Sequence, residues 1–156
     1  MGDGYRAVCG NCGYESQTLC CGFGMSYPDW VFQTHVIFLC KECREFISIA
    51  VFCSEKFIKR YIEKEKKGKI KHDYITNCMY KEKTKEIIRR LKRFIPYSRK
   101  QHKTGIICPK CKSKKLREIN VRSHTDGDKG KRFSGPIVCP KCHKKKLLFK
   151  HILDWD

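Results

Sequence analysis

Four pairs of cysteines constrain this chain more than any other feature of its sequence. In each pair two residues separate the cysteines, and the pairs are Cys9/Cys12, Cys40/Cys43, Cys108/Cys111 and Cys139/Cys142. Such a turn, called a knuckle below, directs two thiolates at one metal ion, and two knuckles complete a tetrahedron of sulfur ligands. The chain has only 156 residues, and small modules with thin cores commonly need metals or disulfides to stay folded. We therefore predict two zinc ions.

The spacing of the knuckles indicates an internal repeat. Twenty-seven residues separate the first knuckle from the second and the third from the fourth, and each cysteine of the first half has a counterpart 99 positions later. The repeat predicts that consecutive knuckles share an ion, in one site of Cys9, Cys12, Cys40 and Cys43 and another of Cys108, Cys111, Cys139 and Cys142. Redox-active or disulfide-bonded pairs are the alternative, but two matched sets favour metal.

The residues that follow the second knuckle of each half have the pattern of β-strands. Apolar side chains alternate along 46–53, and an apolar run occupies 147–149. Strand, knuckle, loop, strand, knuckle and strand is the layout of a zinc ribbon, and both halves resemble that family. The resemblance implies an α+β chain in which two small zinc-ribbon β modules are joined by a basic helical segment. The predicted parts are the first ribbon (1–53), a helical segment (54–95), a linker (96–105) and the second ribbon (106–156).

The chain is strongly basic. Lys and Arg number 35 against 16 Asp and Glu, which gives a formal charge of +19. Two zinc sites with four thiolates each would lower this balance to about +15. Such a charge favours polyanionic partners, nucleic acid first. The chain has no apolar run of membrane-spanning length and no signal-peptide pattern at its start, so we expect a cytoplasmic protein (nuclear if eukaryotic) without a membrane partner.

The segment between the predicted ribbons contains two helical patterns. Ser54 is suited to cap the first, and Pro96 is expected to end the second. The second pattern has an apolar stripe, and its opposite side carries Lys81, Lys85, Arg89, Lys92 and Arg93. A solvated helix face is the simplest explanation, but the excess of positive charge favours contact with phosphates. Docking on a membrane surface fits less well, because the apolar stripe lacks tryptophan.

The loop of the second predicted ribbon supplies further basic residues: Lys129, Lys131 and Arg132. Its Arg122-Ser123, followed by Asp126, is similar to the zinc ribbon of transcript-cleavage elongation factors. There a hairpin carries adjacent acids that hold a metal ion in the polymerase active site. This chain departs from that pattern, because His124 and Thr125 intervene and no Glu follows Asp126. A flexible turn explains the same residues.

The sequence contains no phosphate-binding loop, no HExxH zinc motif and no nucleophile elbow. A four-cysteine zinc site also has no open coordination position for a substrate. We therefore predict a non-catalytic, zinc-stabilised protein that binds DNA or RNA, in a process such as transcription, and has no small-molecule substrate. The alternative is an adaptor that docks on a larger protein complex such as a polymerase.

Overall fold

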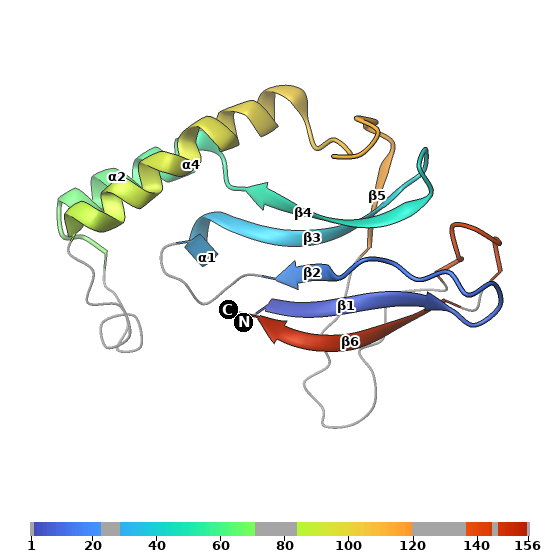
Figure 1. The fold of residues 1–156 in the computed structure, drawn as a ribbon. Helices are drawn as coiled ribbons and strands as arrows, with labels where there is room; N and C mark the ends of the chain where they lie inside the picture. Colours follow the sequence, from blue (N-terminus) through green and yellow to red (C-terminus); the bar gives the residue numbers. More distant parts are fainter. Residues whose placement is uncertain (1, 23–28, 71–83, 120–136, 145–146, 156) are drawn as a thin grey trace.

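A twisted antiparallel β-sheet forms the centre of the computed structural model, which describes residues 2–22, 29–70, 84–119, 137–144 and 147–155 (Figure 1). The strands follow the order β4-β3-β2-β1-β6, and β5 pairs with β3 beside the short β2. Together with the two long helices described below, the sheet confirms the α+β class. The strands are β1 (Gly2–Cys9), β2 (Leu19–Gly22), β3 (Gln33–Cys40), β4 (Glu45–Phe52), β5 (Leu116–Ile119) and β6 (Leu147–Trp155).

Strands from the two predicted ribbons pair with each other. The first knuckle joins β1 to the segment that leads into β2, and the second knuckle is the turn between β3 and β4. The C-terminal half adds one strand to each hairpin, because β5 pairs with β3 and β6 pairs with β1. Gly2 lies opposite Trp155, so the two ends of the chain meet at one edge of the sheet (Figure 1).

Three apolar clusters hold the described part of the molecule together, and one of them includes two of the predicted ligand cysteines: Phe38, Cys40, Ile47 and Cys108. The sheet cluster draws residues from both halves of the chain: Tyr5, Ala7, Leu19, Ile37, Phe46 and Ile119. The helix cluster consists of Phe32, Ile58, Ile62, Ile87 and Leu91. Phe32 belongs to the short helix α1 (Asp29–Phe32), which leads directly into β3. Residues that are far apart in sequence thus share the sheet cluster, whereas the helix cluster lies beside the end of the sheet.

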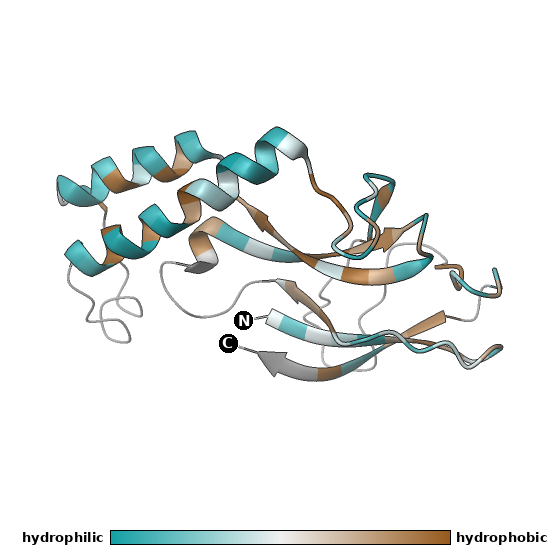
Figure 2. Cartoon of the chain, turned by 45° about the horizontal axis from the view of Figure 1, so that its top comes forward, coloured by the Kyte–Doolittle hydropathy of each residue, from teal (hydrophilic) through white to brown (hydrophobic). Residues whose placement is uncertain are grey.

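Helices α2 (Glu55–Lys66) and α4 (Thr84–Thr104) form an antiparallel pair that projects from one end of the sheet (Figure 1). The Ser54 hydroxyl accepts a hydrogen bond from the Phe57 N–H at 3.3 Å and caps α2, as its sequence predicts. Figure 2 shows hydrophobic bands on both helices among mostly hydrophilic turns. Among the described residues, no helix has both the length and the apolar character needed to cross a membrane.

The prediction that the helix ends at Pro96 and is followed by a linker is wrong. Helix α4 continues through Pro96 to Thr104 and ends at Gly105, which adopts a positive φ of 77° and donates its N–H to the Gln101 carbonyl. Glycine is the usual residue at this capping position. The missing N–H of a proline removes one helical hydrogen bond, but the turns that follow it form hydrogen bonds with β4 and with Cys53 just beyond that strand. The Ser98 hydroxyl, for example, is fully buried and donates to the Cys53 carbonyl at 2.6 Å.

Candidate metal centres

Eight cysteines gather in two groups of four, and each group could hold one metal ion. The sulfur atoms of a group all lie within 4.8 Å of one another. The outer site takes the first and last knuckles of the chain, and the inner site takes the two middle ones. The outer site is Cys9, Cys12, Cys139 and Cys142, and the inner site is Cys40, Cys43, Cys108 and Cys111.

This grouping corrects the tandem arrangement that the repeat predicts. All eight predicted cysteines lie in the two groups, but neither group combines the two knuckles of one half of the repeat. Strand register gives the reason. Cys9 of β1 lies opposite Leu147 of β6, and Cys40 of β3 lies opposite Leu116 of β5. Leu147 and Leu116 each follow the last cysteine of a knuckle by five positions. The same offset thus places one hairpin knuckle beside one C-terminal knuckle in both sites.

The knuckles share one backbone conformation. In the first knuckle the Gly13 N–H donates to the Cys9 carbonyl at 3.1 Å, and the Cys9 N–H donates to the Tyr14 carbonyl at 2.8 Å. Equivalent pairs of bonds form at Cys108 and at Cys139. The residue after each second cysteine has a positive φ: 71° at Gly13, 53° at Arg44, 61° at Lys112 and 59° at His143. This repeated geometry aims both thiols of each knuckle toward the same point.

Sulfur–sulfur distances between the paired knuckles match a tetrahedral ion. They are 3.7 Å for Cys9–Cys142 and Cys12–Cys139, 3.5 Å for Cys40–Cys111 and 3.8 Å for Cys43–Cys108. Ligands at a Zn–S distance of about 2.3 Å in a tetrahedron are about 3.8 Å apart. A disulfide would require about 2.05 Å, and the described cysteines are all unbridged. The donor set and its spacing therefore fit zinc.

The thiols of each group perturb one another. Backbone N–H groups, that of Asn11 first, lower the pKa of Cys9 to about 6. The pKa of Cys12 instead rises to about 12: the Tyr14 N–H lowers it, but burial and the neighbouring thiols outweigh that effect. Burial is the largest cause that raises the pKa of Cys43, also to about 12. Four adjacent thiols cannot all ionise without a compensating cation, and a dication supplies that charge.

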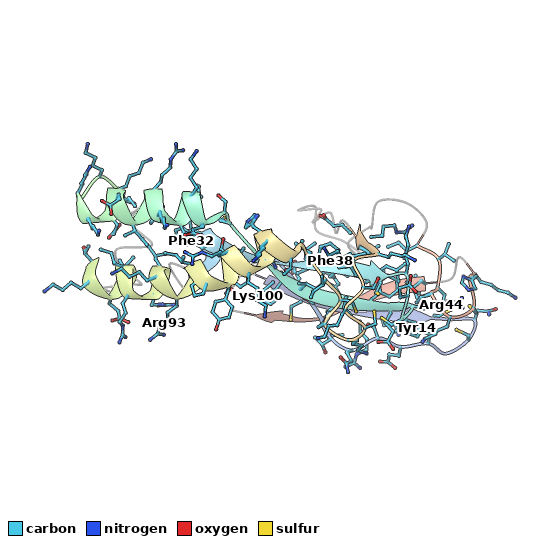
Figure 3. All side chains as sticks on the ribbon, turned by 90° about the horizontal axis from the view of Figure 1, so that it is seen from above. Tyr14, Phe32, Phe38, Arg44, Arg93 and Lys100 are labelled. Carbon is cyan, nitrogen blue, oxygen red and sulfur yellow. The ribbon has the colours of Figure 1, made fainter. Side chains whose placement is uncertain are left out.

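The predicted phosphate-binding residues lie far from the cysteines. Lys85, Arg89, Lys92 and Arg93 are exposed on α4, and Figure 3 shows Arg93 on the helix and Arg44 near the opposite end of the molecule. The remaining predicted residues lie outside the described part of the chain, as does the segment similar to cleavage factors. They are Lys81, Lys129, Lys131 and Arg132.

Sequence reasoning missed two features of this region. It did not single out the residue after each knuckle, although Arg44 and His143 adopt a backbone conformation that favours glycine. It also missed a signal for the correct grouping. The two C-terminal knuckles share the sequence Cys-Pro-Lys-Cys, which the hairpin knuckles lack. In the structure each site combines one knuckle of each kind.

No protein-family model matches the chain, and neither the curated proteins nor the solved structures include a significant match.

Proposed function

We propose that the chain is a nucleic-acid-binding protein whose two sites hold structural zinc ions and whose helix α4 contacts phosphates. The observation that carries the proposal is the exposed basic side of α4. Ile87 and Leu91 of this helix are buried, and α4 packs against α2. Its basic residues therefore extend from a face that the core does not use: Lys85, Arg89, Lys92 and Arg93.

Several of these charges are available to a partner. Arg89 forms an ion pair with Glu86 on its own helix. Lys85, Lys92 and Arg93 have no ion pair with any described residue. An unpaired cation on a rigid helix can neutralise a phosphate and release its condensed counterions, which favours binding. Lys92 and Arg93 are consequently the residues that we expect to contribute most.

The metal sites would act as structural supports in this proposal. Each site would be the centre of a zinc-ribbon-like unit that consists of one hairpin and one added strand. The outer unit contains β1, β2 and β6, and the inner unit contains β3, β4 and β5. Four sulfur ligands leave zinc without an open position, so the ion would contribute folding free energy and no catalysis. Helix α2 follows β4 directly and α4 rests against it, which would fix the basic face on the inner unit.

The proposal is tested by reversing the charges of Lys92 and Arg93. The double change Lys92→Glu with Arg93→Glu should weaken binding to nucleic acids of many sequences by similar factors. The slope of log affinity against log salt should become shallower by about one for each lost phosphate contact. Fluorescence anisotropy with short single-stranded and duplex probes, over a range of salt concentrations, measures both quantities.

A second double variant is the matched control. Lys56→Glu with Lys64→Glu makes the same change of net charge at exposed positions of α2. It should weaken binding much less, because it leaves the α4 face intact. Equal losses in the two variants would show that binding follows net charge alone and would contradict a specific face on α4. No binding by the wild-type protein at low salt would contradict the proposed function itself.

One observation favours the adaptor as a second candidate. Leu148 and Ile152 of β6 are exposed, at 64% and 39%, on a strand that ends the described order of the sheet. Exposed apolar groups on an edge strand are suited to a protein partner. The apolar stripe of α4, by contrast, is already buried in the helix cluster. Binding through β6 would depend little on salt, whereas phosphate binding weakens steeply with it.

A further inference from the structure

A pocket of about 330 Å³ lies between one knuckle of the inner site and one knuckle of the outer site. Its apolar wall contains Leu39, Val138 and Pro140. The ligand cysteines Cys40 and Cys139 also line the pocket, together with four basic side chains: Lys41, Arg44, Arg117 and His143. The volume falls in the lower range of small-ligand pockets. The pocket is far from the basic face of α4, since Figure 3 places Arg44 and Arg93 toward opposite ends of the molecule.

The negative groups nearest these cations are the two metal centres, because Cys40 and Cys139 also line the pocket and each centre would carry a charge of −2 with zinc bound. Among the described residues that line it there is no carboxylate. The nearby acids of the second knuckle are already paired, Glu42 with Lys115 and Glu45 with Lys110. Lys41, Arg44 and Arg117 form no ion pair within the described ranges. Three permanent cations thus face a single concave surface.

Two of the basic residues occupy backbone positions that favour glycine. Arg44 has a φ of 53° and His143 a φ of 59°, whereas the first knuckle has Gly13 at the equivalent position. A residue other than glycine is disfavoured in this left-handed region. At these two positions Arg44 and His143 each bring to the pocket a side chain that glycine would lack.

We infer that the pocket binds the phosphate group of a nucleotide, with Arg44 and Arg117 as its principal contacts. Guanidinium groups bind phosphate oxygens through paired, charge-assisted hydrogen bonds. The wall of Leu39, Val138 and Pro140 offers apolar contact to the sugar or base. The inference rests on the proposed function for the source of the nucleotide, a nucleic-acid strand, and adds a second phosphate site at the end opposite α4.

The test compares adenosine monophosphate, adenosine and inorganic phosphate by amide NMR titration of the full chain with zinc bound. Adenosine monophosphate should shift the amides of Lys41, Arg44 and His143 and bind more tightly than the other two probes. The variant Arg44→Gly should weaken this binding by about tenfold or more, the loss expected for charge-assisted hydrogen bonds. Glycine fits the φ of this position, so zinc content and the remainder of the spectrum should be preserved.

Lys112→Gly is the matched control. Lys112 occupies the same position after the third knuckle, with a φ of 61°, but it does not line the pocket, and its ammonium group donates to the Pro109 carbonyl. This variant makes the same backbone change and loses the same charge. It should change the affinity for adenosine monophosphate by less than about threefold, because the lost charge acts only at a distance.

Several results would overturn the inference. They are equal losses in Arg44→Gly and Lys112→Gly, adenosine binding as tight as that of the monophosphate, or inorganic phosphate binding as tight as the nucleotide. Loss of zinc from Arg44→Gly, with no nucleotide bound by the wild type, would show that the cations only offset the charge of the thiolate centres. The proposed function fails separately: oligonucleotide binding could be absent while the monophosphate binds, or present while the pocket binds nothing.

Discussion

Two properties of single residues define the metal centres, the identity of the cysteines and the conformation of the residue after each knuckle. The spacing of the cysteines predicts all eight candidate ligands, because two thiolates of a knuckle can serve only one ion. It does not predict their grouping. Cys9 and Cys40 are as far apart in sequence as Cys108 and Cys139, so equal spacing fits tandem and nested sites alike. Only the register of β5 and β6 decides between them.

The nested grouping is tested by counting zinc in double variants. Cys9→Ser with Cys139→Ser changes only the outer site, so one ion should remain, whereas Cys9→Ser with Cys40→Ser damages both sites and should remove two. Elemental analysis of protein purified without added metal measures the content. Cys20→Ser with Cys21→Ser is the control and should retain both ions, because these cysteines belong to neither group. The reverse order of losses would restore the tandem arrangement.

Helix α4 shows how one element covers the edge of another. The Gln101 side chain accepts a hydrogen bond from the Phe52 N–H at 2.9 Å and donates to the Ala50 carbonyl at 2.8 Å. These backbone groups belong to β4, which ends the described order of the sheet opposite β6. The amide therefore bonds the strand much as a neighbouring strand would. Arg99 supports the same approach through two bonds to Glu55 at the start of α2.

Replacement of Gln101 by leucine should loosen this contact. The Phe52 amide would lose its acceptor, so its hydrogen exchange should become about five to ten times faster, as expected for a bond worth about 1 kcal/mol. Exchange followed by NMR measures the effect at that amide. Lys100→Leu is the control, because Lys100 is exposed on the same helix and its side chain forms no hydrogen bond with the described residues of β4. An unchanged Phe52 rate in Gln101→Leu would show that the helix does not protect the strand edge.

On the scale of the whole molecule, the chain is arranged as one unit inserted into another. The inner unit, from β3 to β5, includes both long helices, and β1, β2 and β6 surround it in sequence. Local patterns predict β4, β6 and both helices because alternation, apolar periodicity and capping depend on neighbouring residues. The pairing of β1 with β6 joins residues near the two ends of the chain, and no local pattern predicts it. The prediction that α4 ends at Pro96 is wrong for a related reason. The hydrogen bond that the proline removes is offset by contacts between the last turns of α4 and β4, which is distant in sequence.

The sheet cluster and the helix cluster predict how the molecule responds to the loss of one ion. Tyr5 of β1 and Ile37 of β3 share the sheet cluster, so the outer unit supports the inner one, whereas the helix cluster contains no residue of β1, β2 or β6. In Cys139→Ser the remaining ion should therefore be held less tightly, by about tenfold for roughly 1.4 kcal/mol of lost packing. Competition with a chromogenic chelator measures this affinity. Hydrogen exchange of Ile58 and Leu91 should stay close to wild type, because their cluster does not depend on the outer site.

An unchanged chelator affinity would show that the two units fold independently. Loss of protection at Ile58 and Leu91 would show instead that sheet and helices form one cooperative unit.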